Sequence, residues 1–382
     1  MAGEKRTFLG LYCGPSADGV DAALVRIAGR GAEMQPVQKH ALTRPLWGPL
    51  RERLSRVASG WAVPAADLAK LGRDVASCFA RAAKDVLRAG HTRATSLAGV
   101  GLIAPSVGYV RPTPSAGAGA LVELTAGPLV AQRLHVPVVS GFASSDLSAG
   151  GVGGPMWAWP DWLLFRDDRL SRVVVQLGAI ASITFVGSAA AACEVVAFDT
   201  GPGTILIDAL MKRLHNAPMD TDGAAAARGH VHKALLHELM AAEYFHQDPP
   251  KRSGAADWSG AAQERLESMA GKHRCHAGDL LTTVTELTAR TVARDVLART
   301  ERPHEVILAG GGARNIHLAG RIRQLLSPCS TYAAERYGLA LEAHAAVSCA
   351  ILAAGRLDGF PAHCHAATGA KAPVVLGALW AP

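Results

Sequence analysis

Asp199 stands where a catalytic carboxylate would be expected. It closes the apolar run 195–199 and is followed at once by the turn Thr200-Gly201-Pro202-Gly203. A carboxylate at the carboxyl end of a strand, beside a turn that admits a ligand closely, is well placed to act as a general base. Asp also caps turns of this kind, so a purely structural Asp199 is the alternative.

Three Gly-rich turns follow expected strands and could direct backbone N–H groups at phosphate oxygens, because Gly has no Cβ to block the approach. They are Gly14-Pro15-Ser16-Ala17-Asp18-Gly19, the segment from Gly178 to Ser182, and Gly310-Gly311-Gly312-Ala313-Arg314-Asn315. None is a Walker loop or a Rossmann fingerprint. The third precedes a helix, whose N-terminus would face an anion. One such turn is typical of a structural hairpin, whereas three in one chain favour a nucleotide site.

Asp18 and Asp21 flank the first turn, where they could orient water molecules on Mg²⁺ or serve only as turn residues. Three tryptophans, Trp157, Trp159 and Trp162, share one loop, and we expect them in the core rather than stacked on a sugar ring. The two His-x-His pairs, at 230/232 and 363/365, lack the spacing of a zinc site and are interpreted as surface residues.

The elements around these residues predict an α/β fold. Apolar residues at three- and four-residue steps predict a helix over 64–89, and further helices are expected over 205–214, 224–245, 279–299 and 338–354. Hairpins are expected at 7–27 and 173–186, and residues 29–60 are interpreted as irregular. Two hairpins in separate halves predict two lobes, 1–142 plus 356–382 and 143–355, each with its own sheet.

Composition excludes several classes of protein. The chain has 382 residues, 49% hydrophobic and 19% charged, which is too apolar for a disordered chain. No apolar run approaches the length of a membrane span, and no signal-peptide segment is evident. The seven Cys are scattered without paired spacing, so we expect a reduced, cytoplasmic protein. The net charge of +7 is spread along the chain, which predicts no nucleic-acid partner.

The order of the motifs resembles bacterial anhydro-N-acetylmuramic acid kinases, of the actin/hexokinase/Hsp70-like ATPase superfold. That family's first loop reads roughly GLMSGTSLDGVD and its catalytic segment FDTGPGN. The matching segments are GLYCGPSADGVD at 10–21, FDTGPGTILID at 198–208, DTDGAAAARG at 220–229, PPKRSG (for PPKSTG) at 249–254, TVTELTA at 283–289, AGGGARN at 309–315 and TYAAERYGLALEA at 331–343. They cover essentially the whole chain.

The resemblance implies a two-lobed fold with an interlobe nucleotide cleft. It implies ATP and Mg²⁺ as cofactors, a small carbohydrate as acceptor, no membrane partner, a homodimer and a role in peptidoglycan recycling. In the family, water activated by an Asp opens the 1,6-anhydro ring while the released O6 takes the γ-phosphoryl group, and the matching residue here is Asp199. Position in the motifs implies that Asp146, Gly150, Gly151 and Pro155 contact the acceptor.

Departures from the family pattern touch two of the Gly-rich turns but concentrate in the acceptor half, where the motifs GSHGQT (at 101–106), QIGNP (around 123–127) and DFRxxD (at 141–146) are lost. Pro15 replaces a Thr, Ala179 replaces a Gly, and Ala143 replaces the Arg of DFRxxD. Arg pairs a carboxylate through two charge-assisted hydrogen bonds, which Ala143 cannot form. We therefore expect the family's muramate substrate to be poor here. The alternatives are a kinase for a different carbohydrate-like metabolite and a catalytically impaired nucleotide-binding relative.

Overall fold

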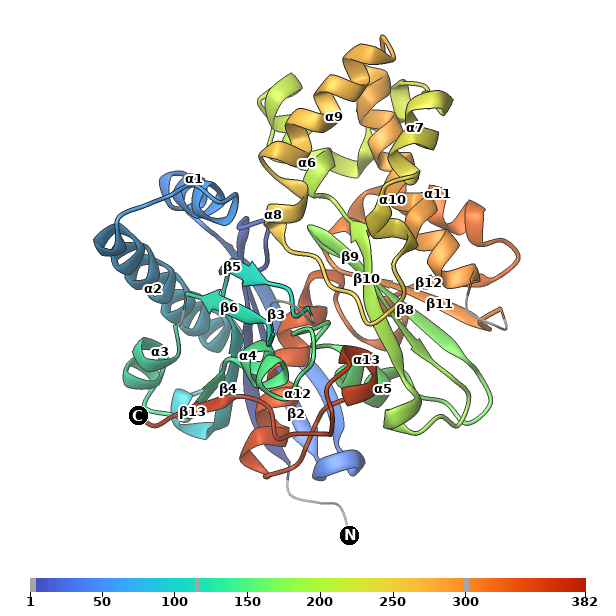
Figure 1. The fold of residues 1–382 in the computed structure, drawn as a ribbon. Helices are drawn as coiled ribbons and strands as arrows, with labels where there is room; N and C mark the ends of the chain where they lie inside the picture. Colours follow the sequence, from blue (N-terminus) through green and yellow to red (C-terminus); the bar gives the residue numbers. More distant parts are fainter. Residues whose placement is uncertain (1–4, 114–116, 125, 299–301) are drawn as a thin grey trace.

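The computed structural model describes residues 5–113, 117–124, 126–298 and 302–382. Within this part of the chain, strands and helices form two lobes around two separate sheets, and the C-terminal end lies beside the first lobe (Figure 1). The predicted α/β class and the two hairpins are confirmed.

The first lobe is built on a six-stranded sheet in the order β13-β7-β4-β1-β2-β3. β1, β2 and β3 are antiparallel neighbours, whereas β4 and β7 run parallel to β1. The strands are β1 (Arg6–Tyr12), β2 (Gly19–Ala28), β3 (Gln35–Pro45), β4 (Leu97–Ile103), β7 (Val138–Ser140) and β13 (Ala378–Trp380). A ribbon of β5 (Ser106–Val110) and β6 (Ala120–Glu123) adjoins it.

The prediction of irregular structure over 29–60 was wrong, because β3 and helix α1 (Gly48–Ala58) lie there. β3 is an edge strand whose outward residues are largely polar, so it lacks the apolar alternation that reveals a strand. The helix predicted over 64–89 is found as α2 (Ala65–Ala89). Its apolar stripe, which includes Val75, Phe79 and Val86, is buried in the core on one face of the sheet.

Helix α12 (His344–Leu357) covers the opposite face, packing on β1 and β4. A Cβ atom on Gly10 or Gly101 would collide with the carbonyl oxygens of Ala346 and Cys349, so the helix backbone lies directly on both strands. The division predicted from the sequence assigned residues 143–355, and so most of α12, to the second lobe. In the structure α12 packs on the sheet of the first lobe instead. The apolar residues of α12 cover Phe8, Val25 and Ile27 of the first sheet, a long-range contact that hydrophobic periodicity does not reveal.

The second lobe contains the sheet β10-β9-β8-β11-β12. Its strands are β8 (Arg172–Leu177), β9 (Ile180–Val186), β10 (Val196–Pro202), β11 (Glu305–Ala309) and β12 (Ser330–Ala333). Its helices are α6 (Ile205–His215), α7 (Lys233–Met240), α8 (Ala255–Trp258), α9 (Ala261–Lys272), α10 (Ala277–Leu297) and α11 (Ile316–Leu326). The mostly helical stretch expected over 224–245 begins with a turn, because Asp220 accepts hydrogen bonds from the amides of Ala225 and Ala226.

Between the sheets lie α4 (Phe142–Ser148), α5 (Ala158–Phe165) and α13 (His365–Thr368), while α3 (Gly127–Leu134) packs on α2. Trp159 and Trp162 are buried in the core cluster that joins the two lobes, as predicted. All seven cysteines are free. In the described part of the chain, no helix has the length and apolar character to cross a membrane.

Candidate active site

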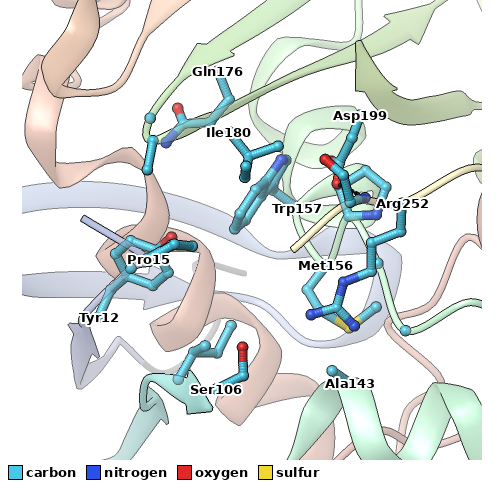
Figure 2. Close-up of a pocket in the computed structure, with 18 of the residues that line it drawn as sticks. Tyr12, Pro15, Ser106, Ala143, Met156, Trp157, Gln176, Ile180, Asp199 and Arg252 are labelled. Carbon is cyan, nitrogen blue, oxygen red and sulfur yellow. Dashed lines mark hydrogen bonds between the residues drawn. The ribbon is translucent and has the colours of Figure 1, made fainter. Parts of the chain in front are cut away.

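The first and second Gly-rich turns face each other across one cavity between the lobes. Gly14 and Pro15 line it from the end of β1, and Gly178 and Ala179 line it from the turn between β8 and β9. Figure 2 shows Pro15 and Tyr12 on one side of this cavity and Gln176 and Ile180 opposite them. The structure thus brings together two of the three turns predicted to hold phosphates.

The turn after Asp199 packs on the second Gly-rich turn. The amide of Gly203 donates to the Ala179 carbonyl at 2.8 Å, and the amide of Thr204 donates to the Gly178 carbonyl at 2.9 Å. A Cβ atom on Gly203 would collide with the Gly178 carbonyl, so only Gly permits this approach. Gly201 has φ 142°, and its Cα lies against the ring of Phe245.

The third turn packs behind the second. Gly310, at φ 87°, and Gly312 both lie against the Leu177 carbonyl. Asn315 caps α11, since its Oδ1 accepts from the Leu318 amide at 2.9 Å. Gly310, Gly311, Gly312 and Asn315 are not among the residues that line the cavity, so their predicted role in binding nucleotide stays a prediction.

Asp199 lies on β10 and faces the cavity, with 6% of its surface exposed. Its Oδ2 accepts from the Ser253 amide at 2.9 Å, and its carbonyl accepts from the Tyr244 hydroxyl at 2.9 Å. Burial raises the pKa of Asp199 to about 6, although the Ser253 amide and the charges of Arg252 and Lys251 oppose this rise. A carboxyl group with this pKa is largely ionised at pH 7 and can accept a proton.

Carboxylates gather near the first turn. Asp18 is exposed and accepts from the Ser16 hydroxyl at 2.8 Å. Burial raises the pKa of Asp21 to about 7 and that of Asp208 to about 7, and the charge of Asp18 adds to both shifts. Among the residues described, no three side chains are arranged to hold a metal ion by themselves. Hard oxygen donors of this kind suit Mg²⁺ that keeps its water and takes phosphate oxygens as further ligands.

Asp146, predicted to contact the acceptor, is fully buried instead. Its carboxylate accepts from the Thr368 hydroxyl and from the Gly153 amide, and it lies 2.7 Å from Nε2 of His363. This network ties the loop 150–155 to the C-terminal segment, so Asp146 positions that loop rather than lining the cavity. His363, interpreted as a surface residue, is buried because it supplies this contact.

The other residues predicted to contact the acceptor, Gly150, Gly151 and Pro155, lie on the same loop, but only some of them line the cavity. Pro155 lines the cavity, together with Gly153 and Gly154, whereas Gly150 and Gly151 do not. Gly151 lies against the Asp146 carboxylate and Gly150 against Lys371. The first half of the loop therefore anchors it, and the second half faces the site.

Trp157, Glu123 and Arg252 are among the lining residues that were missed or assigned elsewhere. Trp157 was expected in the core, but it lines the cavity and donates from Nε1 to the Ser182 hydroxyl at 2.9 Å. Glu123 accepts from the Ala104 amide at 3.0 Å, and burial raises its pKa to about 7. Arg252 reaches the cavity from the loop before α8. Glu123 lies outside the segments that match family motifs, and Arg252 lies within the matching segment PPKRSG, so neither gave a signal as a site residue.

Comparisons with known proteins bear on this arrangement. The model of the family described as anhydro-N-acetylmuramic acid kinase matches residues 6–382. The chain belongs to the anhydro-N-acetylmuramic acid kinase family. A relative of that name from Gloeobacter violaceus is 36% identical over 372 residues, covering 97% of each chain. One from Salinibacter ruber is 33% identical and covers 99% of this chain and 97% of its own. The expected carbohydrate kinase is thereby confirmed at the level of the family.

Solved structures resemble the chain more distantly. Component A of the (R)-2-hydroxyglutaryl-CoA dehydratase of Acidaminococcus fermentans is 10% identical, with a TM-score of 0.46 over 91% of this chain and 96% of its own. The ROK hexokinase of Thermus thermophilus is 14% identical, with a TM-score of 0.34 over 90% of this chain and 97% of its own.

Proposed function

We propose that this protein uses ATP to open and phosphorylate a 1,6-anhydrosugar, with Asp199 as the general base. Asp199 takes a proton from water, and the water oxygen bonds to C1 of the sugar as the C1–O6 bond breaks. The released O6 attacks the γ-phosphorus of ATP, and the bond to the β-phosphate breaks to leave ADP. The products are a sugar 6-phosphate and ADP.

One observation carries this proposal: Asp199 faces the same cavity as the turns at Gly14 and Gly178. Phosphoryl transfer depends mostly on positioning and on neutralising charge, and these turns bring backbone to the wall of the cavity. A water molecule beside Asp199 needs a base that is ionised at neutral pH, and the pKa of about 6 meets that need.

The first turn supplies the further groups. Asp18 and Asp21 would hold Mg²⁺ through its water ligands, and the ion, when bound, neutralises charge on the phosphates. The turn 310–315 would receive the adenosine. A homodimer, a cytoplasmic location and a role in peptidoglycan recycling are proposed from family membership alone.

An isotope experiment tests the proposal. The protein is incubated with ATP, MgCl₂ and a 1,6-anhydrosugar in water enriched in ¹⁸O, and the products are analysed by mass spectrometry. The proposed reaction places the label on C1 of a sugar 6-phosphate. Label in inorganic phosphate, without sugar phosphate, would show that ATP is only hydrolysed. If no product forms with any anhydrosugar, free sugar or amino sugar, the catalytically impaired alternative replaces the proposal.

A further inference from the structure

The cavity beside Asp199 contains one side chain with a positive charge. Among the described residues that line it, Glu123 and Asp199 are acidic and Arg252 alone is basic. Figure 2 shows the Arg252 side chain extending from the region of Asp199 toward Met156 and Ala143. Any anionic group of a ligand on this side of the cavity would therefore meet Arg252.

Packing holds the Arg252 side chain in this direction. The guanidinium lies over the ring of Tyr109, 4.6 Å from its centroid, and a Cβ atom on Gly153 would collide with Nη1. The Arg252 carbonyl accepts from Arg111 Nη2 at 2.9 Å, which fixes the backbone from which the side chain projects. A guanidinium confined in this way loses little freedom when it binds a ligand.

The guanidinium nevertheless has an unused donor. Nη1 of Arg252 is buried and has no hydrogen-bond partner among the described residues. Gln176 Oε1, in the same cavity, is likewise buried and unpaired. Buried polar atoms are almost always paired in folded proteins, so unpaired ones that face a cavity point to a ligand.

Ala143 and Arg252 line the same cavity, although they are 109 positions apart in the sequence. In the motifs of the family, Arg stands at the position of Ala143 and Ser at the position of Arg252, as DFRxxD and PPKSTG show beside GFASSD and PPKRSG. The chain thus lacks the guanidinium at one wall of the cavity and has gained one at another. The positive charge lost at position 143 is thus replaced by the positive charge gained at position 252.

We propose that Arg252 takes the place of the Arg missing at position 143 and binds the carboxylate of the acceptor sugar. This inference rests on the proposed function and reverses the expectation that a muramate substrate is poor. Two N–H groups of a guanidinium match the two oxygens of a carboxylate, which Lys or Ser cannot reproduce. Pro15 of the first turn and Ile180 beside the second lie in the part of the cavity away from Arg252, where the phosphates are proposed to bind (Figure 2).

Two sugars that differ in the relevant group test the proposal. 1,6-Anhydro-N-acetylmuramic acid carries a lactyl carboxylate, and 1,6-anhydro-N-acetylglucosamine does not. We expect the parent protein to have the higher kcat/KM on the first. R252S should lower the ratio of the two kcat/KM values about 10- to 100-fold, and R252K should lower it less. The ratio is insensitive to the fraction of folded protein, because both sugars are assayed on the same preparation.

Two further variants sharpen the test. R26S removes the same charge from an exposed position on β2, far from the cavity lining, and should leave the ratio as it is. The double variant R252S/A143R returns the guanidinium to the other wall and should recover most of the preference. An unchanged ratio in R252S would overturn the proposal, and so would equal losses on both sugars, which would assign Arg252 to the transferred phosphoryl group.

Calorimetric binding of the two sugars separates this inference from the proposed function. If the parent protein phosphorylates neither sugar yet binds the carboxylated one more tightly, and R252S abolishes that difference, the function fails and the carboxylate site stands. If both sugars are phosphorylated and R252S leaves their ratio unchanged, the function stands and the carboxylate site fails. If neither sugar binds, both are wrong.

Discussion

Nε2 of His363 lies 2.7 Å from Oδ1 of Asp146, and both side chains are buried. The Val374 amide donates to Nδ1 of the same ring at 3.3 Å, so Nε2 carries the proton and donates to the carboxylate. The pair joins α4 to the C-terminal segment. Since Asp146 also accepts from the Gly153 amide at 2.6 Å, the contact positions the loop that lines the cavity.

Replacing His363 by Ala should therefore destabilise the protein and impair acceptor binding. The Asp146 carboxylate would lose a donor while remaining buried, which costs about 2–4 kcal/mol of unfolding free energy. We expect a lower Tm and a raised KM for the sugar, measured by denaturation and steady-state assays. H365A, two residues away, is the control and should change stability by less than about 0.5 kcal/mol. Unchanged stability in H363A would show that the contact does not hold the loop.

Asp199→Asn separates a catalytic from a structural role. Asn can accept the hydrogen bond from the Ser253 amide but cannot take a proton from water, so kcat should fall about 10²- to 10⁴-fold. ATP affinity should be retained, as measured by calorimetry. D168N, at an exposed position, is the control for the change of charge. A loss of stability with nearly unchanged kcat would identify Asp199 as a turn residue only, and Asp208 would then be the next candidate for the base.

The raised pKa of Asp199 gives activity and stability opposite dependences on pH. The base must be ionised, so kcat/KM should rise with pH and level off above about 6. Between the unfolded value of 3.8 and about 6, the folded state holds the proton more strongly than the unfolded state. This contribution to the unfolding free energy is therefore lost as pH rises through that window, by about 1–3 kcal/mol.

The D199N variant tests whether the ionised Asp199 lowers the stability of the folded protein at neutral pH. At pH 7 the variant lacks the buried charge, so its Tm should match or exceed that of the parent protein, whereas at pH 4 the two should converge. The measurement is a set of thermal melts from pH 4 to 7. If D199N is less stable than the parent at pH 7 but not at pH 4, the ionised carboxylate stabilises the fold and burial does not dominate.

Pro15→Thr should improve the use of ATP. Pro15 lines the cavity in the first turn and has neither a backbone N–H nor a hydroxyl group to donate. Thr supplies both, and one or two added hydrogen bonds to phosphate predict a KM for ATP that is about 2- to 10-fold lower. P15A serves as the control, because Ala restores the backbone N–H without adding a hydroxyl group. An unchanged KM in both variants would show that this turn does not contact the nucleotide.

The sequence alone determined the family, the α/β class and the candidate base. Turns at Gly14, Gly178 and Gly310 and the segment around Asp199 are local features, because each requires particular residues within a few positions of one another. Such requirements leave short motifs in a fixed order. The same logic explains why α2 and the two hairpins could be predicted from periodicity.

Only the tertiary structure decided the features that depend on distant parts of the chain. Asp146 was assigned to the acceptor from its motif, but its partner His363 lies 217 positions away and makes it a buried anchor. Helix α12 belongs on the first sheet because Gly10 and Gly101 admit its backbone. The pKa of Asp199 follows from burial, and Arg252 and Ala143 line the same cavity because of how distant parts of the chain pack together. Burial and contacts between distant residues arise only when the chain packs, so they cannot be predicted from the spacing of neighbouring residues.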